Sequence, residues 1–131
     1  ARLCIEPALA GEAALNASAE SVRRMRLALD RASAAANWDD YEAQDDTFHR
    51  AIAEASDNEL LVGLFDQLNR VRRAVAFGVV QRETPRPAAG HSSFAEHERI
   101  AAAIERRDRA AAQEAMRTHL ISVSKRLFEE G

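Results

Sequence analysis

Apolar residues recur at steps of three and four along almost the whole chain, a spacing that places them on one face of a helix. The alternation of apolar and polar residues that a half-buried strand needs is not found in the sequence. Because the connections between segments are short, neighbouring helices should run antiparallel. We therefore predict an all-α antiparallel bundle with six helical segments, at about residues 7–15, 20–36, 38–55, 58–79, 92–106 and 108–129.

Residues with capping preferences set the predicted helix ends. Pro7 suits the first position of the first helix, where its missing N–H would have no partner in any case. One long break spans residues 81–91, whose prolines and glycine prevent a continuous helix. Side chains that accept a hydrogen bond from the first turn precede four of the other helices: Ser18, Asn58, Ser92 or Ser93, and Asp108.

Composition narrows the class of protein. The 131 residues suit one domain with a single core, and 47% hydrophobic, 30% charged and 5% aromatic residues fit packed helices. The net charge of −3 is too weakly acidic to suggest a surface for polyanions, and no basic face is evident. The single cysteine, Cys4, and the lack of an apolar run of about 18 residues predict a cytoplasmic chain that spans no membrane. No signal peptide is recognisable, and the abrupt start suggests a fragment of a longer protein.

The third predicted helix carries a polar pair on its buried face. Asp45 and His49 lie one turn apart, on the same face as Phe48 and Ile52. Those two large apolar side chains require that face to be buried. A carboxylate there is costly unless something pairs with it.

Two further helices also direct an imidazole inward. His97 shares a face with Phe94 and Ile104, and His119 lies on the stripe that contains Met116 and Leu120. Each of these histidines alone has an ordinary interpretation as a core residue bonded to a carbonyl. The Asp45–His49 spacing alone could likewise be a helix-stabilising contact.

Taken together, the four side chains indicate a metal site. Burying Asp45, His49, His97 and His119 without a shared partner would cost several kcal/mol, and one divalent cation would satisfy all of them. Imidazole nitrogens with one carboxylate oxygen suit zinc or nickel, our preferred candidates, and also iron, manganese or cobalt. Asp46 is expected to face solvent, although it could support the site from outside. We expect His91, which lies in the proline-containing break, to be exposed rather than a ligand.

These residues fall in motifs that resemble a known family. The run D-D-T-F-H-R-A-I-A-E-A-S-D-N at residues 45–58 resembles the D-x-x-F-H-x-x-I-A-x-A-S-x-N signature of the FCD domain. That domain is the C-terminal, effector-sensing half of FadR-type regulators in the GntR superfamily. Residues 96–108 resemble its E-H-x-x-I-x-x-A-I-x-x-x-D segment, and residues 111–120 resemble its A-x-x-x-x-M-x-x-H-L ending. The opening Arg2-Leu3-Cys4-Ile5-Glu6 is similar to its R-x-x-x-E start.

The resemblance carries expectations about fold and partners. It implies a bundle of six or seven helices with a central cavity, one metal held by an Asp and three His, and a homodimer. Its metal-binding branch takes a small carboxylate effector, such as a hydroxy acid, sugar acid or dicarboxylate. DNA binding would belong to an N-terminal winged helix-turn-helix that this chain does not contain, so residues 1–131 are predicted to form a single FCD-type domain. For the effector, Arg2 matches the family position that reaches the pocket.

A second arginine is suggested by helical spacing rather than by the resemblance. Arg72 continues the apolar stripe of its helix, and a buried guanidinium invites an anionic partner. Snorkelling of this side chain to the bundle edge is the other interpretation of its position. Arg2 and Arg72 are therefore the two predicted effector contacts.

Other functions are compatible with four metal ligands. A mononuclear metalloenzyme, either a hydrolase or an oxygenase, is the main alternative, because an open metal position serves binding and catalysis alike. No general base, nucleophile or lid accompanies the four ligands in the sequence, so we predict a sensor and no enzyme. A ferritin-like storage bundle is disfavoured because we expect no inward Glu beside the histidines. A purely structural bundle, in which the metal only links the helices, is a further alternative.

Overall fold

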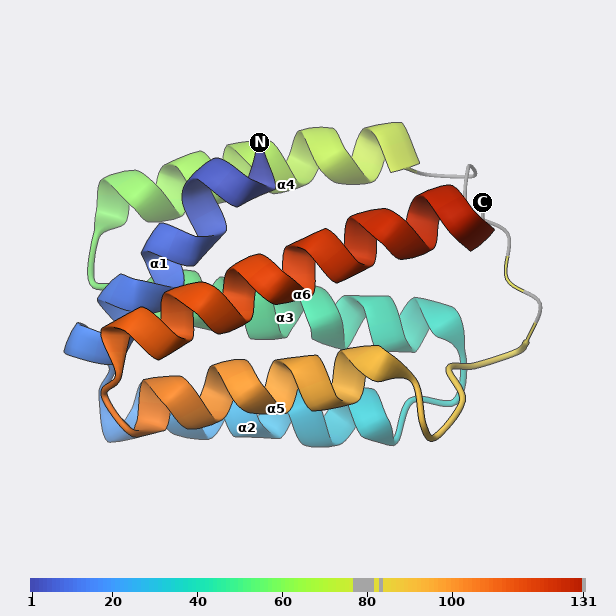
Figure 1. Cartoon of the computed structure of the whole chain (residues 1–131), viewed down its shortest axis with the longest axis horizontal. Coiled ribbons are helices and arrows are strands. Elements are labelled where there is room, and N and C mark those ends of the chain that lie inside the picture. The colour runs from blue at the N-terminus through green and yellow to red at the C-terminus, as the bar shows by residue number, and fades with distance from the viewer. Residues whose placement is uncertain (77–81, 83, 131) are drawn as a thin grey trace.

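The chain folds into a bundle of α-helices in the computed structural model, which describes residues 1–76, 82 and 84–130. Within these residues there are six helices and no strand (Figure 1). The predicted all-α architecture is therefore confirmed. The predicted positions Val79 and Gln81 lie outside the described residues. The helices are α1 Arg2–Asn16, α2 Ala19–Ser33, α3 Trp38–Ala55, α4 Glu59–Ala76, α5 Ser92–Glu105 and α6 Arg109–Glu130.

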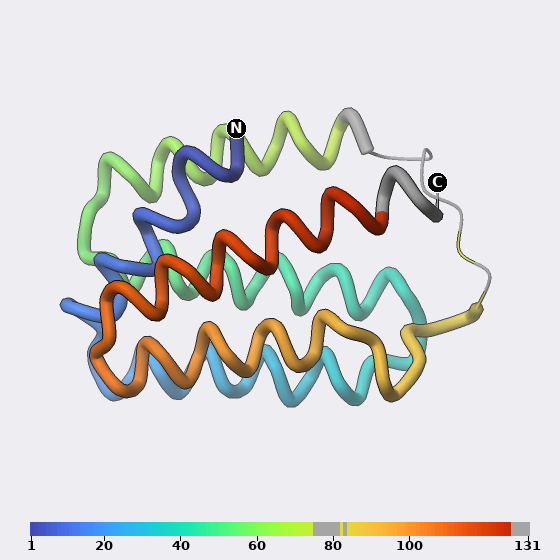
Figure 2. The backbone as a smooth tube through the Cα atoms, viewed as in Figure 1, coloured from blue at the N-terminus to red at the C-terminus, as the bar shows by residue number. Residues whose placement is uncertain are grey.

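The helices pack around a centre formed by α1, α3, α5 and α6. Helix α1 contacts α6, α3 and α5, while α2 packs on α3 and α5. Helix α4 lies at one edge, where it contacts only α1 and α3 among the described helices (Figure 2). Side chains on α3, α5 and α6 can therefore meet in the interior, whereas α4 keeps one side uncovered.

Two tight turns of the same design reverse the chain. Asp57 and Arg107 follow the ends of α3 and α5 in the left-handed backbone region, with φ of 57° and 62°. Such a residue is common just after a helix, although glycine usually fills the position. The next residue in each turn caps the following helix: Asn58 Oδ1 accepts from Leu61 N at 3.1 Å, and Asp108 Oδ1 accepts from Ala111 N at 3.0 Å. Both predicted caps are confirmed.

The predicted cap of α2 is confirmed, whereas that of α5 is wrong. Ser18 Oγ accepts a hydrogen bond from Ser21 N at 3.0 Å. At α5 the capping acceptor is His91 Nδ1, 3.2 Å from Ser93 N, because Ser93 Oγ turns inward to lie 2.5 Å from Tyr41 Oη. His91 is thus half-buried against aromatic rings and not exposed as the sequence predicted.

Helix α1 starts earlier than the sequence predicted. It begins at Arg2, so Pro7 lies inside the helix rather than at its first position. The proline removes one backbone hydrogen bond there. The five added residues bring Arg2 and Glu6 into the folded bundle, where both form ion pairs.

Small side chains fill much of the core. Ala10, Ala13 and Ala14 of α1 are fully buried, which lets α1 approach its neighbours closely. The larger residues of this cluster come mainly from α2, α3, α5 and α6, and include Met25, Phe48, Ile52, Ile100, Ile104 and Met116. Burial of these apolar surfaces is the main term that stabilises the bundle.

Replacing Ile104 by Ala should destabilise the protein by about 2–5 kcal/mol, because the side chain is fully buried and leaves a cavity in the core. The measurement is urea unfolding with a chelator present, so that metal binding does not contribute. Leu27→Ala is the matched control, since Leu27 is 45% exposed on α2, and it should change the free energy of unfolding much less, by about 0.5 kcal/mol. Equal losses in the two variants would contradict the assignment of the core.

Candidate metal centre

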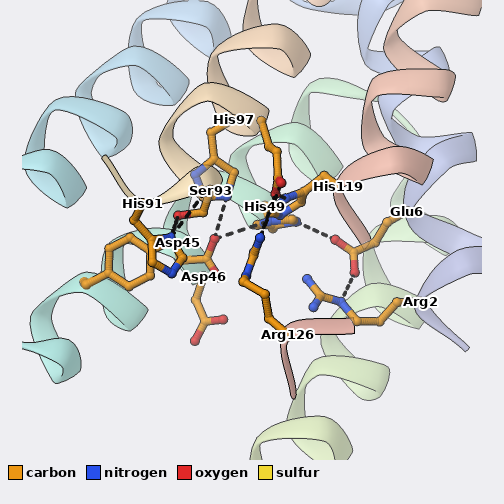
Figure 3. A network of polar contacts seen from close by, with 12 residues as sticks. Arg2, Glu6, Asp45, Asp46, His49, His91, Ser93, His97, His119 and Arg126 are labelled. Atoms are coloured by element: carbon orange, nitrogen blue, oxygen red, sulfur yellow. Dashed lines mark hydrogen bonds and ion pairs between the residues drawn. The ribbon is translucent and has the colours of Figure 1, made fainter. Parts of the chain in front are cut away.

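The four predicted metal-ligand side chains meet inside the bundle (Figure 3). Asp45 and His49 lie one turn apart on α3, His97 comes from α5, and His119 comes from α6. Each residue offers one ligand atom, and these four atoms all lie within 4.8 Å of one another. The structure therefore brings together the whole set that the sequence singled out.

Packing of α3 explains why this polar group is buried. Phe48 and Ile52 are almost fully buried, and they turn the same face of α3 that carries Asp45 and His49 toward the core. The ring of Phe48 also packs on His97, with centroids 5.0 Å apart. Apolar side chains thus surround the imidazoles and hold them close together.

The atoms that face one another lack ordinary hydrogen-bond partners. Asp45 Oδ1 lies 2.9 Å from His97 Nε2 and 3.3 Å from His49 Nε2. The groups are close enough for ion pairs, yet none of these three buried atoms has a partner aligned for a hydrogen bond. Leaving a buried polar atom unsatisfied costs about 1–3 kcal/mol. One divalent cation between them would satisfy all three, so the donor set fits a metal.

Two buried carboxylates stand behind the imidazoles. Glu6 Oε1 accepts from His49 Nδ1 at 2.5 Å, and Glu96 Oε1 accepts from His119 Nδ1 at 2.6 Å. The expectation that no inward Glu accompanies the histidines is wrong, since Glu96 directly precedes His97 and is buried. Both carboxylates bind the ring nitrogen that faces away from the cluster. They therefore do not form the bridging pair of a ferritin-like site.

Each carboxylate is also paired with an arginine. Arg2 Nε lies 2.5 Å from Glu6 Oε2. Glu96 Oε2 accepts from Ser122 Oγ at 2.7 Å and lies 3.3 Å from Arg126 Nη1. Sequence reasoning noted Glu6 and Glu96 only as motif positions of the resemblance, without a role, and did not single out Arg126. The spacing of Glu96 with Ser93 and Ile100 on the buried face of α5 is the signal that could have identified it.

A family model for the FCD domain matches residues 1–122. The chain belongs to the FCD domain family. The predicted membership in FadR-type regulators of the GntR superfamily is thereby confirmed.

Two curated regulators are similar to this FCD domain. It is 32% identical over 132 residues to the "Uxu operon regulator" of Haemophilus influenzae. It is 35% identical over 133 residues to the "Uxu operon transcriptional regulator" of Escherichia coli. These alignments cover 98% of this chain but 49% and 52% of the two regulators, so the chain spans about half the length of the curated relatives it matches.

A solved structure has the same helical arrangement. Escherichia coli McbR/YncC superposes with a TM-score of 0.85, over 99% of this chain and 65% of that chain. Its sequence identity is 16%, so this likeness concerns the fold alone. Among the helices described for this FCD domain, none combines the length and the apolar character needed to cross a membrane.

Arg72, one of the two predicted effector contacts, is held by α3. Its Nη2 lies 2.8 Å from Asp46 Oδ1 and 2.6 Å from Asn69 Oδ1, and Arg73 lies 3.0 Å from Asp46 Oδ2. Asp46 was expected to face solvent, but its side chain is only 17% exposed, because α4 covers it with these two arginines. Arg72 itself is 31% exposed. Its link to the cluster is indirect, because its partner Asp46 is the residue that follows Asp45 in the chain.

A small recess reaches the cluster between α2 and α5. Its volume is about 110 Å³, and His97 is among its lining residues. Since sites for small organic ligands usually occupy about 300–1,000 Å³, the predicted central cavity stays a prediction. The other lining residues are Arg26, Leu29, Asp30, Ser33, Phe94 and Glu98.

The surroundings of the histidines move their pKa values in opposite directions. Burial alone would lower the pKa of His49, but the negative charges of Glu6 and Asp45 outweigh it and raise the value to about 9. Burial lowers the pKa of His119 to about 4, and the nearby His49 and His97 add to this effect. Without metal, His49 is therefore protonated at neutral pH and His119 is neutral.

The metal-free domain should lose stability as the pH rises from 6.5 through 9. The pKa of His49 is higher in the folded chain than its ordinary value of 6.5, so its stabilising charge is fully present below pH 6.5 and is lost above pH 9. Thermal unfolding with a chelator across this range measures the loss, and His49→Gln should flatten the dependence. A wild-type unfolding temperature that stays constant or rises over this range would contradict the assignment.

Proposed function

We propose that this FCD domain is the effector-sensing and dimerising half of a transcription regulator, and that it binds a small carboxylate at a divalent metal. The metal would be held by Asp45, His49, His97 and His119. The observation that carries the proposal is the convergence of these four groups, with four of their buried atoms left without hydrogen bonds. The proposed metal is zinc or nickel, with iron, manganese and cobalt as alternatives.

The bound ion would supply a Lewis acid that accepts further oxygen ligands. Four protein ligands leave coordination positions open in a metal that prefers six, and a carboxylate with a neighbouring hydroxyl could fill them. We propose Arg2 and Arg72 as cationic contacts for such an acid, since a guanidinium binds a carboxylate through two parallel hydrogen bonds. Both are paired with carboxylates in the structure, and so an effector would compete with Glu6 or Asp46 for them.

A sensing role is favoured over catalysis by how the polar groups near the cluster are engaged. Glu6 and Glu96, the described carboxylates behind the ligands, are bonded to imidazole and guanidinium. The hydroxyl of Tyr41 is hydrogen-bonded to Ser93, and burial raises its pKa. None of these groups is placed as a free general base or nucleophile, so we propose that the domain is not an enzyme.

The regulatory role rests on the relatives. Both curated relatives are named as operon regulators, and this chain spans about half of their length. We propose that DNA is bound by an N-terminal winged helix-turn-helix in the remainder of the protein, and that the protein acts in the cytoplasm. Effector binding would change DNA binding only in so far as the acid prefers one of two arrangements of the domain.

An exposed apolar stripe on α4 supports a homodimer. Leu60, Leu64 and Val71 lie on one side of this helix and are 75%, 47% and 58% exposed. No such stripe could be identified from the sequence, in which the apolar residues considered, Leu9, Val22 and Met25, could equally have served the internal core. Helix α4 covers only α1 and α3, so this side is available to a second copy of the chain. Burying exposed apolar residues of this size is a usual driving force for association.

Saturating metal should stabilise wild type by about 3 kcal/mol at 100 times its dissociation constant, which raises the unfolding temperature by roughly 10 °C. A thermal-shift screen of divalent metals and small organic acids measures this. His119→Ala should lose the metal response, whereas Arg117→Ala, an exposed position on the same helix, should keep it. A specific acid should stabilise wild type further only when metal is present.

Three results would contradict this proposal. No stabilisation of wild type by any divalent metal would contradict the metal site, and a response of His119→Ala equal to that of wild type would place the ion elsewhere. The acid can also be monitored by chromatography while it is incubated with the metal-loaded domain. Its disappearance would instead support the alternative function as a metalloenzyme.

A further inference from the structure

We infer that Glu6 and Glu96 are the positioning residues of the metal centre, each fixing the tautomer and ring orientation of one ligand histidine. The inference rests on the proposed metal site and assigns a role to two residues outside the ligand set. It concerns how strongly, and with what geometry, the imidazoles of His49 and His119 present their nitrogens to the metal. Carboxylates in this position behind metal-bound histidines raise the basicity of the ligand and hold the ring in place.

The first pair joins α1 to α3. Glu6 Oε1 lies 2.5 Å from His49 Nδ1, and both side chains are 3% exposed. Nδ1 donates its proton to the carboxylate, so a metal that displaces the second proton of His49 would find the lone pair on Nε2. That nitrogen is the one that points at Asp45, 3.3 Å from Oδ1. The tautomer that Glu6 selects is therefore the one a metal ligand needs.

The second pair repeats the arrangement between α5 and α6. Glu96 Oε1 lies 2.6 Å from His119 Nδ1, and the ring of His119 packs on His97 with centroids 4.6 Å apart. Glu96 Oε2 is held in turn by Ser122 Oγ at 2.7 Å. The carboxylate is thus fixed on its other side and cannot rotate away from the imidazole without losing that hydrogen bond.

A guanidinium completes each pair, which gives two chains of contact with the same order of groups, and Figure 3 shows the chain that passes through Glu6. Arg2 contacts Glu6, which contacts His49, and Arg126 contacts Glu96, which contacts His119. A buried carboxylate without a counter-charge would be strongly destabilising. The arginines allow the two glutamates to stay charged beside the imidazoles.

The orientation of the contacts distinguishes positioning from simple linkage of helices. A carboxylate that only joined two helices could bind either ring nitrogen. Here both bind Nδ1, and His49 Nε2 is left buried with no hydrogen bond at the cluster. His97 has no such support, since its own Nδ1 is buried without a hydrogen-bond partner. Two of the three imidazoles are therefore oriented by a carboxylate.

The test is a titration of the domain with Co²⁺, followed by its visible absorption, in wild type, Glu6→Gln and Glu96→Gln. Glutamine keeps the shape and can still accept from Nδ1, but it carries no charge. Each variant should bind Co²⁺ about 10–100-fold more weakly and shift the absorption bands, because the ligand field of the imidazole changes. Glu114→Gln is the matched control, an exposed glutamate on α6 whose partner is Arg117, and it should match wild type.

The outcomes separate this inference from the proposed function. Failure of wild type to bind Co²⁺ would refute the metal site itself. Binding by wild type, with both glutamine variants matching it in affinity and spectrum, would overturn the positioning role and leave the site intact. Circular dichroism with a chelator shows whether each glutamine variant folds. If one does not, the Co²⁺ titration of Ser122→Ala is used in its place to test the positioning role. That variant removes one hydrogen bond from Glu96 and should weaken Co²⁺ binding about fivefold; an unchanged affinity would overturn the inference.

Discussion

The placement of a carboxylate and three imidazoles in the core is the constraint on which the rest of the bundle depends. Polar groups of this kind are usually excluded from an apolar interior because they lose their water. Here Phe48 and the alanine-rich packing leave the three imidazoles at most 3% exposed and Asp45 23% exposed, so the atoms that face one another must satisfy one another or share an ion. Asp45 lies at the centre of this group, within 2.9 and 3.3 Å of two imidazoles. Helices α3, α5 and α6 are held in the register that this meeting requires.

The same constraint accounts for the charged residues around the cluster. His49 and His119 each place one nitrogen toward the cluster and one away from it, and the outer nitrogen of each is taken by a buried carboxylate. Those carboxylates in turn need the guanidinium groups of α1 and α6. Polar contacts thus extend from the centre to the surface on two sides of the bundle. In a regulator, such connected contacts offer a physical route by which occupancy of the centre could alter the helices that surround it.

The sequence predicted the parts of this protein that follow from short-range periodicity. Asp45 and His49 lie one turn apart beside Phe48, and the same spacing placed His97 and His119 on buried faces. The resemblance included Glu6 and Glu96 as motif positions, but the sequence did not predict their burial or their role, since a glutamate on a helix is ordinarily solvated and its burial depends on a partner from a distant segment. Likewise, Pro7 looks like a helix start because its preference is local, but tertiary packing of Arg2 and Glu6 extends α1 beyond it. His91 caps α5 because Ser93 is drawn inward to Tyr41. The effector contacts of Arg2 and Arg72 stay predictions.

The most direct test is an anomalous difference map from crystals of the domain grown with Co²⁺, recorded at the cobalt absorption edge. We expect one peak per chain, within bonding distance of Asp45 and of one nitrogen each from His49, His97 and His119. A map with no peak among these four side chains, or with the ion bound at another position, would contradict the account.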